Sequence, residues 1–142
     1  MTYSNAYCTI VIMKGYNKKG VTEYNIHLQF VIVARYRRKI FAYPGVSDTF
    51  LNVLGHICET NEMRVLDVKF GDEYVHLHIS IPPDISAEQA ASKIRVATSK
   101  SIIAYHEELS RMKTIWTSHL LVGSNITTSQ IQKFVSERKT RN

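Results

Sequence analysis

The stretch that decides the fold is Glu73-Tyr74-Val75-His76-Leu77-His78-Ile79-Ser80-Ile81-Pro82-Pro83. Its alternation predicts a β-strand, because neighbouring side chains of a strand point to opposite faces of the sheet. One face carries Tyr74, His76 and His78, and the other carries apolar residues. The Cα atoms of the two histidines would lie about 6 to 7 Å apart, so both imidazoles can reach one divalent metal ion. A hydrogen-bonded or solvated histidine pair is the alternative interpretation of this pattern.

The whole chain has the size and composition of one folded domain. Its 142 residues are 44% hydrophobic and 21% charged, which excludes intrinsic disorder. We therefore expect a single domain over 1–142, with an N-terminal extension over 1–22. The longest apolar run, around residues 30–33, is too short to cross a bilayer, so we expect no membrane span. Two cysteines and no basic-then-apolar leader favour a reducing, cytoplasmic location.

The positive charge of the chain is clustered. Its 18 Lys and Arg exceed its 12 Asp and Glu, which gives a net charge of +6. The densest cluster is Arg35-Tyr36-Arg37-Arg38-Lys39, and a second group consists of Lys93, Arg95 and Lys100. Cations contact phosphates and a tyrosine ring stacks on a base or sugar, so both groups are candidates for nucleic-acid binding. A solvated strand end and a solvated helix face are the alternatives.

The remaining patterns predict the order of the elements. Residues 1–13 alternate loosely and 15–20 have the composition of a turn, which predicts an opening strand or hairpin. We then expect a strand over 24–34, followed by a helix that Ser47 or Asp48 caps. Two strands, over 63–70 and 74–81, should be joined by a turn. A capping box at 86–89 should begin a long helix toward Leu109 and Met112, and a strand over 116–123 and a helix over 129–139, after the capping box at 127–130, should complete the chain.

Two segments that are separated in the sequence occupy defined places in this order of elements: one follows the strand over 24–34, and the other forms the strand over 74–81. They are Ala34-Arg35-Tyr36-Arg37-Arg38-Lys39-Ile40-Phe41 and Val75-His76-Leu77-His78-Ile79-Ser80-Ile81-Pro82-Pro83. Together they resemble the single-tyrosine HUH transposases of bacterial and archaeal insertion sequences, over roughly residues 24–138. The resemblance implies an α+β fold with a ferredoxin-like antiparallel sheet, helices packed on one face of it, and a homodimer.

The same resemblance implies an activity. Members of this family bind hairpins in single-stranded DNA at the ends of the element. A tyrosine attacks the scissile phosphate and forms a 5′-phosphotyrosine, while two histidines and usually a glutamine hold Mg²⁺ or Mn²⁺ on a phosphate oxygen. The metal ion withdraws charge from the phosphate, and the covalent intermediate conserves bond energy for rejoining.

Matched residue by residue, the histidine strand departs from the family pattern. The run Ser80-Ile81-Pro82-Pro83 places His76 on the second family histidine and Tyr74 on the first. His78 lies on the same face and offers a replacement ligand, two residues along the strand. The predicted metal ligands are therefore His76 and His78, displaced relative to the nucleophile helix.

The terminal helix departs as well. The tyrosine of the family falls on Phe134, which has no oxygen to attack with, and the glutamine falls on Arg138, which has no lone pair for a cation. Glu137 is a substitute ligand about 100° around the helix. We therefore expect a DNA-binding protein of transposase descent whose strand cleavage is lost or impaired.

Two alternatives remain open from the sequence. One is an active transposase, with Tyr74 or Tyr105 as the nucleophile, or an engineered form that carries Phe134 in place of the nucleophilic tyrosine. The other is a ferredoxin-like module that binds RNA or senses a metal and shares only its architecture with transposases.

Overall fold

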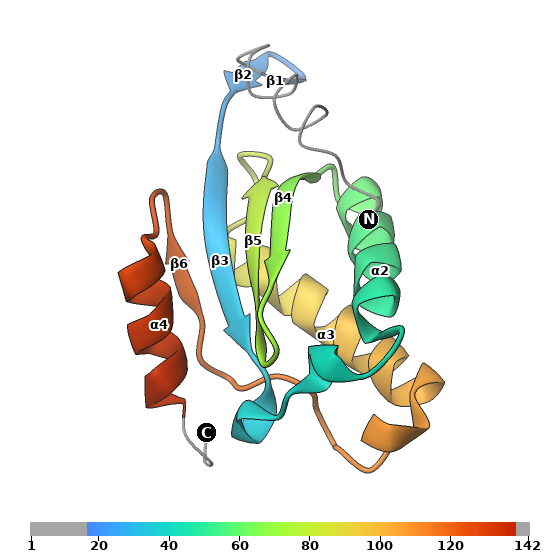
Figure 1. Cartoon of the computed structure of the whole chain (residues 1–142). Coiled ribbons are helices and arrows are strands. Elements are labelled where there is room, and N and C mark those ends of the chain that lie inside the picture. The colour runs from blue at the N-terminus through green and yellow to red at the C-terminus, as the bar shows by residue number, and fades with distance from the viewer. Residues whose placement is uncertain (1–16, 139–142) are drawn as a thin grey trace.

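The computed structural model describes residues 17–138 and contains a four-stranded antiparallel sheet with the strand order β4-β5-β3-β6 (Figure 1). The strands are β3 (His27–Val33), β4 (Arg64–Phe70), β5 (Tyr74–Ser80) and β6 (Leu121–Gly123). A separate small hairpin consists of β1 (Asn17–Lys19) and β2 (Thr22–Tyr24). The helices are α2 (Val46–Thr60), α3 (Ala87–Tyr105) and α4 (Thr128–Glu137). This is the α+β architecture with an antiparallel sheet that the sequence predicts.

The histidine stretch forms β5, which pairs with β3 on one side and β4 on the other. The register places Val33 opposite Tyr74 and His27 opposite Ser80. The strand ends at Ser80, shortly before the two prolines, because proline cannot donate a ladder hydrogen bond. The central strands therefore hold the side chains of β5 in fixed rows with those of their neighbours.

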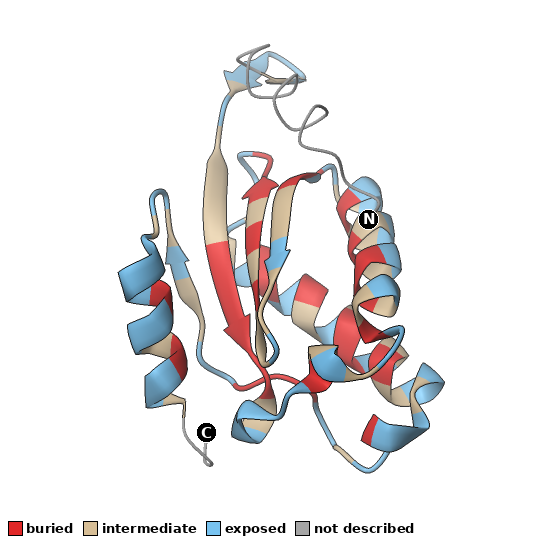
Figure 2. Ribbon diagram, in the orientation of Figure 1, coloured by how far each residue is buried: buried red, intermediate tan, exposed pale blue. Residues whose placement is uncertain are grey.

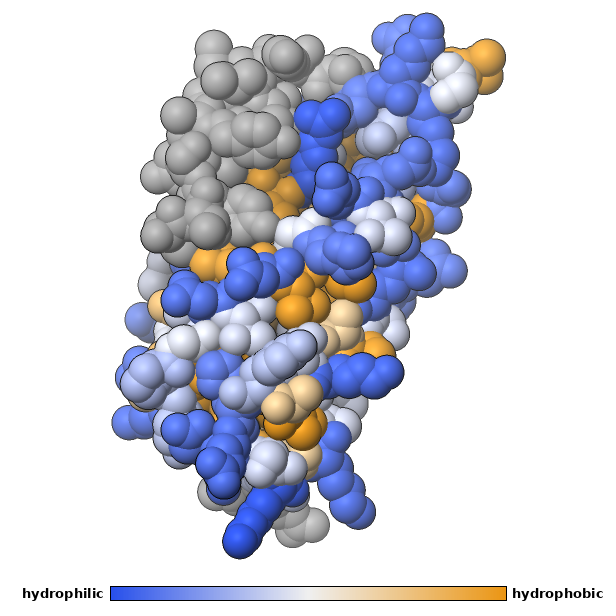
Figure 3. Space-filling model, turned by 90° about the vertical axis from the view of Figure 1, so that its right-hand side faces the viewer, coloured by the Kyte–Doolittle hydropathy of each residue, from blue (hydrophilic) through white to orange (hydrophobic). Residues whose placement is uncertain are grey.

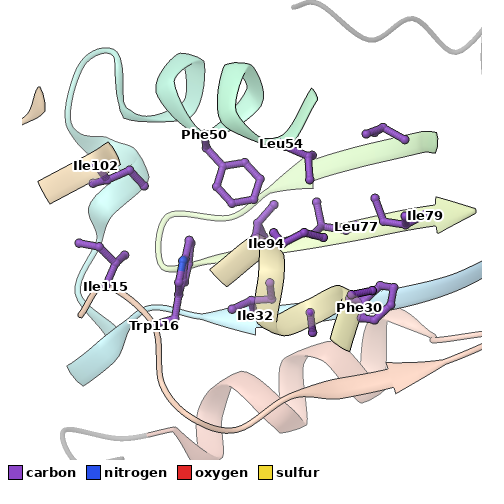
Figure 4. Close-up of a cluster of buried hydrophobic side chains, with 14 of the residues drawn as sticks. Phe30, Ile32, Phe50, Leu54, Leu77, Ile79, Ile94, Ile102, Ile115 and Trp116 are labelled. Carbon is purple, nitrogen blue, oxygen red and sulfur yellow. The ribbon is translucent and has the colours of Figure 1, made fainter. Parts of the chain in front are cut away.

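The main core lies between the sheet and the helices α2 and α3. Figure 4 shows Phe30, Ile32, Leu77 and Ile79 of the sheet facing the helices that carry Leu54 and Ile94. All six are fully buried. Phe50 and Trp116 close one end, with their ring centroids 5.8 Å apart at 78°. Apolar residues at helical spacing on α2 and α3 thus meet the apolar residues at alternating positions on the strands.

Helix α4 packs on the opposite face of the sheet, so the expectation that the helices lie on one face holds only for α2 and α3. Val31 and Val33 of β3 are buried against Ile131 and Val135 of α4. In Figure 2 the second half of β3 is buried throughout. The apolar end of β3 is therefore covered on both faces, by the main core on one side and by the amphipathic helix α4 on the other.

Several element ends differ from the predictions because of tertiary contacts. Helix α2 begins at Val46 after Gly45 in the left-handed conformation, with no side-chain cap from the expected Ser47 or Asp48. Helix α3 ends at Tyr105, because His106 turns away and its ring hydrogen-bonds Thr49 at 2.8 Å.

Both predicted capping boxes, at Ser86–Gln89 and Thr127–Gln130, are confirmed. The last strand is shorter than expected, since Trp116 forms only an isolated bridge with Ala34.

The N-terminal predictions are tested only in part. The strand expected within 1–13 lies outside the described residues. Residues 17–19, expected within a turn, form β1 instead, and the chain turns between β1 and β2 at Gly20, whose φ is +60°. Within residues 17–138, no helix combines the length and apolar composition needed to cross a membrane.

Candidate nucleic-acid interface

The polar face of β5 carries two histidines that each contact a different residue of β3. His76 Nε2 donates to Gln29 Oε1 at 2.8 Å, and His78 Nε2 lies 2.9 Å from His27 Nδ1. In the second pair one nitrogen donates and the other accepts, so the two rings share one hydrogen bond. The sheet register produces these contacts, because Gln29 and His27 lie on the same face as the β5 histidines.

Both histidines of β5 favour the neutral form. Partial burial lowers the pKa of His76, and the nearby Lys69 lowers it further, against an opposing effect of Asp67. Partial burial also lowers the pKa of His78, with His27 and His76 acting in the same direction and Asp67 against it. The rings are therefore hydrogen-bonded and uncharged near neutral pH.

The donors present on this face do not fit a bound Mg²⁺ or Mn²⁺ ion. The side chains of His76 and His78 hydrogen-bond Gln29 and His27. The carboxylate of Asp67, opposite His78 on β4, accepts from the backbone N–H of Val68. Within residues 17–138 no group of three His, Cys, Asp or Glu side chains is arranged to hold a metal ion. Glu137, the proposed substitute, instead contacts Arg138 at 3.6 Å. Both imidazoles are hydrogen-bonded to residues of β3 and are therefore not arranged as two ligands of one ion.

Phe134 lies beside the apolar cluster under α4. Its half-buried ring packs against the cluster formed by Val31, Val33, Ile131 and Val135. The guanidinium carbon of Arg138 lies 4.7 Å from the centroid of the Phe134 ring, which is a cation–π contact. The position expected for the nucleophile thus holds a packed phenyl ring with a cation over it.

Tyr74 joins the same apolar cluster from β5. Its ring also lies directly against the backbone of Gly71, because a Cβ atom at position 71 would come within 2.2 Å of Tyr74 Cε2. The tyrosine is therefore held between the β4–β5 turn and the α4 side of the sheet. Tyr74 and Phe134, two of the three positions at which the sequence indicates a departure from the family pattern, therefore contact one shared cluster.

The basic cluster after β3 is held in an unusual backbone conformation. Tyr36 and Arg37 both have positive φ, at 61° and 52°. Such conformations are strained for residues other than glycine and concentrate at functional sites. Backbone hydrogen bonds from Ala34 to Glu73 and from Arg35 to Ile115 fix the start of this segment. The result is a tyrosine ring that remains 54% exposed, with the Arg35 guanidinium carbon 5.7 Å from its centroid.

Two cavities adjoin this segment. The first, of about 450 Å³, lies between α3 and residues 114–118, and the second, of about 560 Å³, lies between residues 35–38 and 111–114. Arg35 and Thr114 line both of them. We call the six cations that line the cavities the basic rim: Arg35, Arg38, Arg95, Lys100, Arg111 and Lys113. No acidic residue of the described range lines either cavity, so the rim attracts anions.

The other predicted nucleic-acid residues have different surroundings. Arg37 Nε donates to Glu73 Oε2 at 2.9 Å and is thereby engaged in an ion pair. Lys39 and Lys93 are exposed but line neither cavity. Of the eight predicted residues, the structure brings together Arg35, Tyr36, Arg38, Arg95 and Lys100 around the two cavities. Figure 3 shows that the surface over α2 and α3 is mostly hydrophilic, with small apolar patches.

Arg111 and Lys113 belong to the basic rim but were not predicted. Their stretch was assigned to the end of the long helix, whereas in the structure α3 ends at Tyr105 and residues 111–114 form a loop. Two cations separated by one residue after the buried Leu109 were the available signal in the sequence. Only the early end of α3 brings this loop beside Tyr36.

Comparisons with known proteins identify the family and the fold. The family described as "Transposase IS200 like" matches residues 22–138. A putative transposase from Deinococcus radiodurans R1 superimposes with a TM-score of 0.77 at 16% identity, over 87% of this chain and 98% of that chain. A REP-associated tyrosine transposase bound to a REP hairpin superimposes with a TM-score of 0.54 at 13% identity, over 83% of this chain and 68% of that one.

The comparison with curated proteins gave no match. At such low identities the two structural neighbours establish the fold alone, whereas the family match spans most of the chain. The chain therefore belongs to the IS200-like transposase family.

Proposed function

We propose that this protein binds hairpins in single-stranded DNA through its basic rim and does not cleave them. Three features support the proposal: the family, the unopposed cations around the two cavities, and the replaced catalytic positions. The REP-associated relative was solved bound to a hairpin. We extend that class of ligand to the present chain, because six clustered cations suit a polyanionic strand.

The observation that carries the loss of cleavage is the packing of Phe134. A phenyl ring has no oxygen that can attack a phosphate, and this ring packs against an apolar cluster below Arg138. Tyr74, at the first histidine position of the family, packs in the same cluster. Replacing Phe134 by tyrosine would therefore leave Tyr74 and Arg138 at the positions where the family has a histidine and a glutamine.

Binding is proposed to be independent of divalent metal. A metal ion, where a protein holds one, withdraws charge from a phosphate oxygen. Here the imidazoles of His76 and His78 are hydrogen-bonded to Gln29 and His27 instead. Adding a chelator should leave the affinity for hairpin DNA unchanged.

Fluorescence anisotropy tests the binding. A labelled DNA hairpin, the matching RNA hairpin and an unstructured DNA strand are titrated at several salt concentrations. We expect the tightest binding to the DNA hairpin, with a slope of log K against log salt of roughly −3 if about four phosphates are contacted. Preference for RNA would instead favour an RNA-binding module.

A covalent-adduct assay tests the chemistry. The unchanged chain, Phe134→Tyr and the triple variant Tyr74→His, Phe134→Tyr, Arg138→Gln are incubated with labelled hairpin DNA and Mn²⁺. We expect no adduct from the unchanged chain or from the single variant. An adduct from the unchanged chain would refute the loss of cleavage, and its nucleophile would then be sought at Tyr74 or at the exposed Tyr105. An adduct from Phe134→Tyr alone would mean that a single substitution separates this chain from an active enzyme.

We also propose a homodimer, as the family resemblance implies. Light scattering of the full chain at several concentrations measures the mass directly. A monomer at every concentration, with and without hairpin DNA, would contradict this part of the proposal.

A further inference from the structure

We propose that Glu73 is a positioning residue for DNA binding. Its carboxylate holds Arg37, and through Arg37 it keeps the left-handed backbone of Tyr36 and Arg37 in the shape in which the basic cluster 35–39 binds DNA. Arg37 then acts inside the protein and not on a phosphate. The inference rests on the proposed function, because it concerns how the cluster is held for that binding.

The middle of the basic cluster has a backbone conformation that needs support. Tyr36 and Arg37 have φ values of 61° and 52°, and two neighbouring left-handed residues are unfavourable when both carry a Cβ atom. None of the three residues of the short 3₁₀ helix η1 (Arg35–Arg37) is buried, so apolar packing does not fix this conformation. A polar contact from outside the cluster is the remaining means of holding it.

The turn between β4 and β5 contacts both ends of the segment that contains the cluster. The backbone N–H of Ala34 donates to the backbone oxygen of Glu73 at 2.8 Å, and that of Phe41 donates to the backbone oxygen of Asp72 at 3.1 Å. The rings of Phe41 and Phe70 add a contact, with their centroids 4.6 Å apart. In Figure 1 this turn lies beside the lower end of β3, where the cluster begins. Both ends of the segment are therefore fixed to one turn.

Glu73 also contacts the middle of this segment. Arg37 Nε donates to Glu73 Oε2 at 2.9 Å. The Glu73 side chain is only 19% exposed, whereas that of Arg37 is 39% exposed. A charge-assisted hydrogen bond to a largely covered carboxylate is stronger than an ion pair in open solvent. The contact fixes the side chain of the second left-handed residue, and with it the adjoining backbone.

The turn itself is held from its other side. The backbone N–H of Gly71 donates to the backbone oxygen of Tyr74 at 2.9 Å, and the Tyr74 ring lies against Gly71. Tyr74 in turn packs in the cluster under α4. Glu73 therefore projects from a firm support, which lets it impose an order on Arg37.

Two effects of Glu73 on DNA binding have opposite signs. As a negative charge beside the cluster it repels a polyanion, so its removal should strengthen binding. As the partner of Arg37 it orders the cluster before DNA arrives, so its removal should weaken binding, because the DNA must then supply that order. The sign of the change therefore distinguishes a positioning residue from a surface charge.

Three variants remove the same single charge. Glu73→Ala removes the charge and the contact, and Glu73→Gln keeps an oxygen acceptor for Arg37. Asp72→Ala removes the exposed neighbouring side chain and leaves the backbone bond to Phe41. Fluorescence anisotropy at one fixed salt concentration measures the affinity for a labelled DNA hairpin. We expect Glu73→Ala to bind about tenfold more weakly than the unchanged chain. Glu73→Gln and Asp72→Ala should each bind about twofold more tightly.

A second measurement reads the backbone without DNA. The NMR chemical shifts of the Cα and Cβ atoms of Tyr36 and Arg37 depend on their backbone angles. These shifts should change in Glu73→Ala and stay in place in Glu73→Gln and Asp72→Ala, while circular dichroism shows that all three variants are folded. In an Arg37→Ala background, Glu73→Ala should tighten binding as Asp72→Ala does, because the partner of Glu73 is gone.

Three outcomes would overturn the inference while the unchanged chain still binds the hairpin. The first is tighter or unchanged binding by Glu73→Ala, which would leave Glu73 as a surface charge. The second is a set of Tyr36 and Arg37 shifts that Glu73→Ala leaves in place. The third is an equal weakening by Glu73→Ala with and without Arg37. No binding of the hairpin by the unchanged chain would instead refute the proposed function, and the role of Glu73 in DNA binding with it.

Discussion

The two faces of the sheet are built from alternate residues of the same strands and differ in almost every respect. Toward α2 and α3, Phe30, Ile32 and Leu77 are fully buried in one continuous core. On the opposite face, Gln29, His76 and His78 are half-buried and hydrogen-bonded. The difference shows that the polar residues of this face can be replaced without loss of the fold, because the main core of the sheet lies on the other face.

Helix α4 buries few residues on the histidine face of the sheet. Among the residues that the structure describes, four form the buried cluster under α4, whereas the core on the other face contains residues of α2, α3 and three strands. Local stability follows buried apolar contacts, so α4 should detach more readily than α3. The following predictions test this contrast, in order of decreasing expected effect.

The largest effect should come from the core under α3. Ile94 is fully buried, and Ile94→Ala would leave a cavity that the packed helices cannot close. We expect a loss of about 4 kcal/mol in the free energy of unfolding, at the upper end of the range for such substitutions. Urea unfolding followed by circular dichroism measures the change, and an unchanged m-value would show that the unfolding remains cooperative.

The matched substitution on the other face is Ile131→Ala. Ile131 is 7% exposed and belongs to the small cluster under α4. We expect a loss of about 2 kcal/mol, because a helix on the surface can shift to fill part of the space. Hydrogen exchange should accelerate in α4 and not in α3. A loss as large as that of Ile94→Ala would contradict the idea of two unequal faces.

A smaller effect is expected at the turn before β5. In Gly71→Ala the new methyl group would meet the ring of Tyr74, which must turn away. We expect a loss of about 1 kcal/mol from this overpacking. The resonances of Tyr74 and its neighbours in the α4 cluster should shift, while those of the α3 core stay in place.

Gly123→Ala is the control for this substitution. A Cβ at position 123 would have its nearest neighbour, Ile126 Cγ1, at 3.5 Å, which is ordinary contact. Equal effects from the two glycine variants would show that Tyr74 is not held by the turn.

The smallest effect should be the pH dependence of the histidine face. The pKa of His76 and of His78 is lowered in the folded protein, first by partial burial, so the unfolded chain binds these protons more readily. The stabilising contribution is complete above the usual histidine pKa of about 6.5 and is lost as the pH falls through the lowered values. Urea unfolding between neutral and mildly acidic pH measures the slope, and His78→Gln should reduce it. A slope that His78→Gln leaves unchanged would assign the titration to other groups.

Much of the fold follows from local patterns. The alternation of β5, the run of β-branched residues in β3 and the two capping boxes predicted elements that the structure confirms. Each of these signals depends on neighbours within a few residues of the chain. The end of α3 has no such signal, since His106 leaves the helix for a contact with Thr49, which lies far away in the sequence.

The candidate site was predicted less completely for the same reason. The cluster after β3 was visible as a run of cations, but the cavities also need Arg111 and Lys113, from a loop whose position depends on the fold. The histidines of β5 were correctly placed on one face. Their partners, Gln29 and His27, could only be identified from the register between β5 and β3.

The sequence by itself determined most of the helices and strands but not their ends, together with the positive charge, the family resemblance and the absence of an oxygen at Phe134. These properties belong to single residues or to short stretches of the chain. Only the tertiary structure decided that α4 covers the second face, that His76 and His78 are directed to separate partners on β3, and that Arg35 joins two cavities. Such features depend on contacts between residues distant in the chain, and no local pattern specifies them.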